Sequence, residues 1–210
     1  SRHPPPLVRE RPRALRRSPL SEATINPETP AMPLLFVMPW FGKDVRGGAE
    51  IFIFALCENL ARSGTKVEVW TTGTDDVTVR SNKKLRDPLD AQVPFKIRRF
   101  PTNAWSRRIF DFVHRRMNAG NAGWLSGLIW KYTALHGCGM THALKAEHQR
   151  FCSIHLCHYF GGSTHRLAGI ATQKTILHPF VHDEAPAYHA VMGALFARAR
   201  GVLCNSPGEA

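Results

Sequence analysis

The sequence predicts an α/β fold, a doubly wound and mostly parallel Rossmann-like sheet. Residues 34–38 form a continuous apolar run, which is typical of a strand buried on both faces. Helical periodicity follows over residues 49–63, and the β-branched alternation of residues 66–70 indicates the next strand. A strand, a helix and a strand in this order are the building unit of a parallel sheet.

A diglycine, Gly47 and Gly48, stands directly before the predicted helix. Glycines let the backbone come close to a ligand, and the positive end of a helix favours a phosphate or another anionic oxygen. The alternative is that the two glycines only permit a tight turn. The G-x-G-x-x-G spacing is absent, which argues against a nicotinamide or flavin enzyme.

Composition indicates one domain and a tail. The 210 residues suffice for one good core, and the formal charge of +12 implies an anionic partner. Five cysteines without a C-x-x-C pair favour a reducing compartment, so we expect a cytoplasmic protein. No apolar run approaches the roughly 20 residues that span a bilayer, which leaves a peripheral membrane contact open.

The first 31 residues are rich in arginine and proline and lack apolar periodicity. We expect a disordered leader over residues 1–31 and a Rossmann-like domain over residues 32–210.

The middle of the chain is basic and aromatic. Residues 95–100 predict a third strand with an exposed face or edge, and residues 107–117 predict a basic amphipathic segment. One interpretation is helix packing with solvated charges. The other is an interfacial patch that faces anionic lipid or a lipid-linked acceptor. Four apolar residues of the segment can share one helical face: Ile109, Phe110, Val113 and Met117.

Residues 151–159 predict another strand that carries metal-ligand side chains. Strand alternation places Cys152 and His158 on one face and His155 and Cys157 on the other, so the four cannot converge on a tetrahedral ion, and we expect no metal. His158 instead lies where the strand ends, which is where ligands bind in open α/β sheets. A structural histidine is the competing interpretation.

A second group of polar residues, His182, Asp183 and Glu184, follows a short apolar strand at residues 174–177. Asp183 can cap a helix that begins near Glu184. Capping explains Asp183 but not its two neighbours, so the segment is a candidate binding site.

Three segments together resemble the N-terminal domain of family 4 glycosyltransferases, which are GT-B enzymes with two Rossmann-like domains facing a cleft. They are residues 36–50 (FVMPWFGKDVRGGAE), residues 153–162 (SIHLCHYFGG) and residues 176–210, which contain the His-Asp-Glu run and end near Asn-Ser. The segments occur in the family's order and span nearly all of residues 32–210.

The resemblance implies a retaining transfer of a sugar from a nucleotide-diphosphate sugar to an acceptor hydroxyl, in polysaccharide or glycoconjugate synthesis, without a cofactor or metal. Gly47 and Gly48 would approach the donor phosphate or the transferred sugar, and His158 would be the catalytic residue beside the reacting sugar. The acceptor side of the cleft would be lined by His182, Asp183 and Glu184.

Two departures from the family matter. The family often has an acidic residue and a tighter His-x-His spacing where this chain has Ser153, His155 and His158, so which histidine faces the cleft stays open. The family's C-terminal nucleotide-sugar domain has no counterpart in these 210 residues, so we expect this chain alone to be inactive or nearly so.

Three alternatives remain. The first is a non-catalytic half-domain that acts as a binding or partner module. The second is a nucleic-acid-binding protein, which we do not expect because no recognition helix or stacking platform is visible. The third is another nucleotide-sugar enzyme on a Rossmann-like fold.

Overall fold

A computed structural model describes residues 31–45, 47–75 and 81–206. The leader predicted for residues 1–31 therefore lies outside the described residues, apart from Ala31. The described residues belong to one compact unit.

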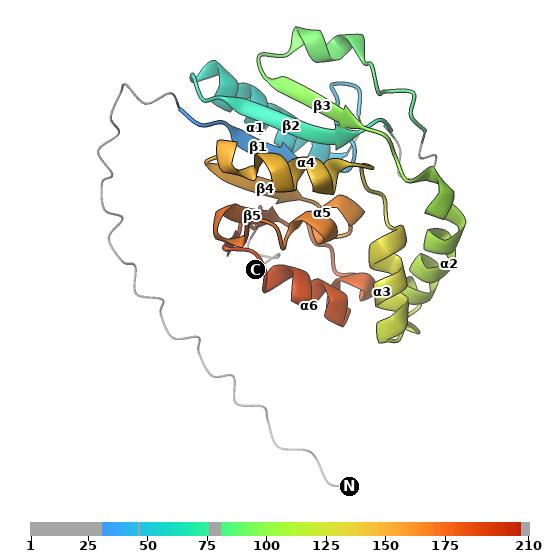
Figure 1. Cartoon of the computed structure of the whole chain (residues 1–210). Coiled ribbons are helices and arrows are strands. Elements are labelled where there is room, and N and C mark those ends of the chain that lie inside the picture. Colours follow the sequence, from blue (N-terminus) through green and yellow to red (C-terminus); the bar gives the residue numbers. More distant parts are fainter. Residues whose placement is uncertain (1–30, 46, 76–80, 207–210) are drawn as a thin grey trace, which may run out of the picture. The chain divides into compact units, whose positions relative to one another are not determined.

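The described residues form a six-stranded, all-parallel sheet with the order β3-β2-β1-β4-β5-β6 (Figure 1). The chain steps outward from β1 to β3 in one direction and from β4 to β6 in the other. The direction therefore switches between β1 and β4, which defines a doubly wound Rossmann-like sheet and confirms the predicted fold class. The strands are β1 (Leu34–Val37), β2 (Val67–Thr72), β3 (Lys96–Phe100), β4 (Ser153–Cys157), β5 (Thr175–His178) and β6 (Gly201–Val202).

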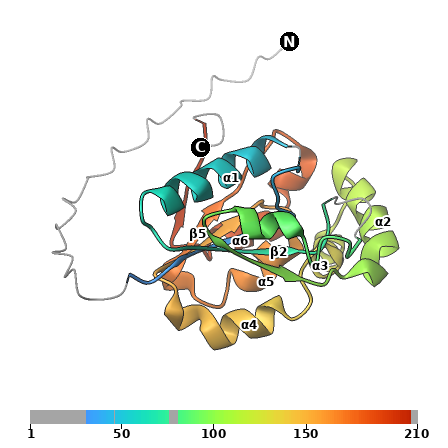
Figure 2. The same ribbon diagram turned by 90° about the horizontal axis from the view of Figure 1, so that it is seen from above.

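Helices cover both faces of the sheet. Helix α1 lies on one face and α4 lies on the other, as Figure 2 shows. This division follows from right-handed crossovers that run in opposite directions from the switch point. The α-helices are α1 (Gly48–Arg62), α2 (Arg107–Asn118), α3 (Trp124–Thr133), α4 (Met140–Glu147), α5 (Gly162–Leu167) and α6 (Ala190–Phe196). Short 3-10 helices are η1 (Pro88–Gln92), η2 (Ala104–Ser106), η3 (His148–Arg150), η4 (Thr172–Lys174) and η5 (Ala185–Tyr188).

Strand β1 contributes to two apolar clusters, one on each face. Leu35 and Val37 pack in the cluster that contains Trp130 of α3, whereas Phe36 packs in the cluster that contains Ile53 of α1. Burial of side chains of this size stabilises a fold by roughly 1.5–3 kcal/mol each. The prediction of a strand buried on both faces is therefore confirmed.

The apolar face predicted for residues 107–117 is buried in part. Phe110, Val113 and Met117 of α2 are buried, whereas Ile109 lies at the flank of this stripe and is 48% exposed. One local prediction was wrong, because no helix capped by Asp183 begins near Glu184. The 3-10 helix η5 occupies that place, and α6 begins later, where Nδ1 of His189 accepts the Val191 N–H at 3.2 Å.

Helices α2 and α3 pack against each other beyond the carboxyl ends of the strands (Figure 1). Within the part of the chain that the structure describes, no helix is both long and apolar enough to cross a membrane.

Candidate functional site

The switch point brings together three side chains from three parts of the chain. Trp40 follows β1, His158 follows β4, and Glu50 lies in the first turn of α1. Ligands of open α/β sheets bind outside the carboxyl ends of the strands at this point. The candidate site is therefore built around these residues.

The backbone of His158 turns its ring toward α1. Strand β4 ends at Cys157, and His158 has a left-handed φ of 70°, which is uncommon for residues other than glycine. Its Nε2 lies 2.9 Å from Oε1 of Glu50. The alternation predicted for residues 151–159 does not extend to Cys152 or His158, because strand β4 covers only Ser153–Cys157.

The Glu50–His158 pair is buried and leaves one ring nitrogen unused. A carboxylate only accepts hydrogen bonds, so Nε2 of His158 carries the proton and donates to Glu50. Nδ1 of His158 is also buried, and among the described residues it has no hydrogen-bond partner. Buried polar atoms are seldom left without a partner, so Nδ1 is an unusual open hydrogen-bonding position within this pair.

The charge of Glu50 is maintained by its neighbours. Burial alone raises the pKa of Glu50, but hydrogen bonding and charge from His158, together with a hydrogen bond from Trp40, bring that pKa below its ordinary value. The carboxylate lies at the amino end of α1, where the helix dipole also favours a negative charge.

Gly47 and Gly48 differ in how closely they approach the Glu50 carboxylate. A Cβ atom at Gly47 would lie 1.9 Å from Oε2 of Glu50, so Gly47 makes room for the acidic side chain. Gly48 is the first residue of α1, and a Cβ there would meet no atom within 4 Å. Because Glu50 already brings a negative charge to this helix end, a second anion there is disfavoured.

Aromatic rings surround His158. The ring centroid of Trp40 lies 5.3 Å from that of His158, and those of Phe160 and Phe180 lie 5.0 Å and 5.4 Å away. Sequence reasoning did not single out Trp40, and its place in the loop that follows β1 was the signal for it. The rings exclude water, which strengthens the charge interaction inside.

The structure separates the three predicted acceptor-side residues. Glu184 accepts a hydrogen bond from the hydroxyl of Tyr159, the residue next to His158. Asp183 is exposed and accepts from Tyr188 at 2.8 Å, and His182 is exposed as well. Of the three residues, Glu184 is thus the one that is hydrogen-bonded to Tyr159, beside His158.

His155 lies within β4 rather than at its carboxyl end. Its ring stacks on Phe36 at 4.5 Å, and its two nitrogens lie 2.8 Å from Oγ of Ser153 and 2.8 Å from Nε2 of His178. Burial and His178 lower the pKa of His155 to about 4, and burial lowers that of His178 to about 4. Of the two histidines left open by the sequence, His158 is the one at the switch point.

A second feature is the exposed surface of helices α2 and α3 and of the 3-10 helix η2 that precedes them, here called the α2–α3 surface. It combines large apolar side chains with arginines beyond the carboxyl ends of the strands (Figure 1). Trp124 is 72% exposed and Phe112 is 57% exposed. The exposed apolar residues are Trp105, Ile109, Phe112, Trp124, Leu125, Leu128, Ile129 and Tyr132, and the exposed basic ones are Arg107, Arg108, Arg115 and Arg116.

The fold and the site define a doubly wound α/β protein with a buried carboxylate–histidine pair at its switch point. No protein-family model matches the sequence, and no curated protein matches it either. Among the described residues, no three histidine, cysteine, aspartate or glutamate side chains are grouped so that they could hold a metal ion.

Proposed function

We propose that this domain is the acceptor-side half of a GT-B glycosyltransferase, which transfers a sugar from a nucleotide-diphosphate sugar to an acceptor hydroxyl. The observation that carries the proposal is the Glu50–His158 pair at the switch point, where Nδ1 of His158 has no hydrogen-bond partner among the described residues. The order of the three family-like segments along the chain gives it independent support.

In this proposal Glu50 positions His158. The carboxylate holds the Nε2–H, which fixes the ring orientation and leaves Nδ1 to contact a hydroxyl of the transferred sugar. The negative charge at the end of α1 favours a sugar rather than a phosphate beside Gly47 and Gly48. The diphosphate would then be bound by the second domain, in keeping with electrostatic stabilisation of the leaving group.

The proposed setting is cytoplasmic, with an acceptor that is a glycan or is linked to a lipid. The α2–α3 surface supports a peripheral contact with an anionic membrane, because its apolar side chains can enter the interface while its arginines face lipid headgroups. The proposed chemistry uses no cofactor or metal.

The test uses the gene that encodes residues 1–210, read to its stop codon. Its product is assayed for release of nucleoside diphosphate from a panel of nucleotide sugars with glycan and lipid-linked acceptors. We expect transfer, a loss of about 100-fold or more in kcat/KM for His158→Asn, and a smaller loss for Glu50→Gln. The 210-residue chain alone should be inactive or nearly so.

The matched control is Glu58→Gln, which changes an acidic residue of the same helix that is paired with Arg62 at the surface. It should leave transfer unchanged. Absence of transfer with every donor, or full activity of His158→Asn, would contradict the proposal and favour a non-catalytic binding module.

A further inference from the structure

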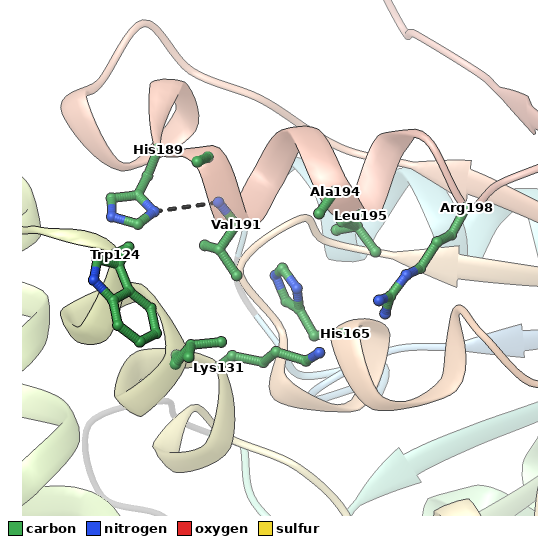
Figure 3. A pocket seen from close by; sticks show the side chains of 10 residues that line it. Trp124, Lys131, His165, His189, Val191, Ala194, Leu195 and Arg198 are labelled. Carbon is green, nitrogen blue, oxygen red and sulfur yellow. Dashed lines mark hydrogen bonds between the residues drawn. The ribbon is translucent and has the colours of Figure 1, made fainter.

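A cavity of about 250 Å³ lies between α3 and α6, apart from the Glu50–His158 pair, neither member of which lines it. Trp124, Leu128 and Lys131 of α3 line one side, and Val191, Leu195 and Arg198 line the other (Figure 3). The lining is mostly apolar, with a few polar groups, as is usual for sites that bind small molecules.

The two walls are held together by His189. Its Nδ1 accepts the Val191 N–H at 3.2 Å, so its Nε2 carries the proton and faces the Gly123 carbonyl at 3.3 Å. A Cβ atom at Gly127 would lie 2.2 Å from Cε1 of His189, so a glycine is required for this close approach. The contacts of His189 therefore fix the two walls of the cavity relative to each other.

The charged groups of the cavity all have the same sign. Lys131 and Arg198 extend to the same end of it, as Figure 3 shows, and none of the described residues that line it is an aspartate or glutamate. Neither cation forms an ion pair with a carboxylate of residues 31–45, 47–75 or 81–206. Burial, Arg198 and Arg166 lower the pKa of Lys131, so an anion between Lys131 and Arg198 would relieve their repulsion.

The apolar wall continues beyond this cavity. A second cavity of about 370 Å³ shares Trp124, His189 and Ala190 with the first and is bounded by Met117 and Ala122. Trp124 and Leu128 also belong to the α2–α3 surface. An apolar chain can thus extend from the cationic end along a continuous apolar wall to the exposed surface.

We propose that the cavity between α3 and α6 binds an anionic amphiphile, with a phosphate headgroup between Lys131 and Arg198 and an alkyl or isoprenoid chain along Trp124 and Leu128. The role of this ligand rests on the proposed function: in sugar transfer, the amphiphile is the acceptor or its lipid carrier. Binding itself is measurable without any sugar transfer.

The test is calorimetric titration of the full 210-residue chain with decyl phosphate, kept below its micellar concentration. Decanol and inorganic phosphate are titrated alongside. We expect decyl phosphate to bind at least 10-fold more tightly than either, because only it satisfies both the cations and the apolar wall. Equal binding of inorganic phosphate would overturn the proposal in favour of a simple ion site, and equal binding of decanol would overturn it in favour of an apolar site.

Two variants locate the binding. The double variant Lys131→Gln/Arg198→Gln should weaken the binding of decyl phosphate at least 10-fold. Ala194 lines the cavity and is exposed, so Ala194→Phe should fill the cavity and block binding. The matched control Lys66→Gln/Arg86→Gln removes the same charge from exposed positions that do not line the cavity.

Unchanged binding in both cavity variants would overturn the proposal. The failure of the cavity proposal can be distinguished from the failure of the proposed function. Binding without transfer by the full gene product leaves the cavity assignment standing, whereas transfer without binding of decyl phosphate removes the cavity assignment alone.

Discussion

Oε1 of Glu50 lies 2.9 Å from Nε2 of His158, although 108 positions separate the two residues in the chain. Helix α1 supplies the carboxylate, and the left-handed turn after β4 supplies the imidazole. Left-handed backbone at a bulky residue costs about 1–3 kcal/mol and persists where the surroundings enforce it, commonly at functional sites. The pair is thus a stabilising contact and the centre of the candidate site.

Truncation of Glu50 should destabilise the domain. Glu50→Ala leaves the buried Nε2–H of His158 without a partner, so we expect the free energy of unfolding to fall by about 1–3 kcal/mol. Urea unfolding measures it. The control Glu58→Ala removes the exposed pair with Arg62 and should cost about 0–1 kcal/mol. Equal effects of the two variants would contradict the buried pairing.

The two glycines should respond differently to alanine. Gly47→Ala places a methyl group against the Glu50 carboxylate and should cost about 1–3 kcal/mol. Gly48→Ala meets no atom and should leave stability the same or higher by up to about 1 kcal/mol. Thermal unfolding of both variants measures the contrast.

A double variant tests whether Gly47→Ala destabilises the domain through the Glu50 carboxylate. If the methyl group acts through the carboxylate, Gly47→Ala/Glu50→Ala should cost less than the sum of the two single variants. Strict additivity would show that the two residues do not interact.

Acid should weaken the fold through two histidines, His178, which is buried, and His155, which is half-buried. The pKa values of His155 and His178 are lowered from 6.5 to about 4, so the unfolded chain takes up protons at a higher pH than the folded one. Their contribution to stability is therefore complete above pH 6.5 and is lost as the pH falls toward 4, by up to about 3 kcal/mol for each group. Urea unfolding at pH 7, 5.5 and 4.5 measures this slope.

The variant His155→Leu/His178→Leu should flatten the slope. A residual slope should remain from His165, whose pKa burial also lowers to about 4. His142→Leu is the control, because His142 is exposed, and it should leave the slope unchanged. A slope that persists in full in the double variant would show that other groups produce it.

The α2–α3 surface should bind anionic membranes. Co-sedimentation of the full chain with phosphatidylserine-containing vesicles at low salt should fall at least 10-fold when the arginines of α2 are replaced, because each basic residue near such a surface contributes roughly 1 kcal/mol. Binding should also weaken as salt rises. The variant carries Arg107→Gln, Arg108→Gln, Arg115→Gln and Arg116→Gln.

A charge-matched control separates this surface from the net charge of the chain. It carries glutamine at four exposed basic positions away from α2: Lys43, Lys66, Lys83 and Arg86. Because both variants keep residues 1–30, the basic residues of that segment are the same in each. Equal losses in the two variants would mean that net charge, and not the surface, drives binding.

Local patterns were sufficient for the elements around the switch point. The apolar run at β1 and the periodicity of α1 each depend on residues close in sequence, and both elements formed within one or two residues of the predicted bounds. The helix predicted near Glu184 failed because local capping signals do not reveal that His189 begins the helix instead.

The sequence by itself determined the fold class, the position of His158 after a strand and the glycines before α1, because hydrophobic period and glycine placement are local properties. Only the tertiary structure decided that His158 pairs with Glu50, that Trp40 covers its ring and that Lys131 meets Arg198 in one cavity. These contacts depend on strand order, on one left-handed residue and on helix packing, which bring together residues that no sequence spacing connects.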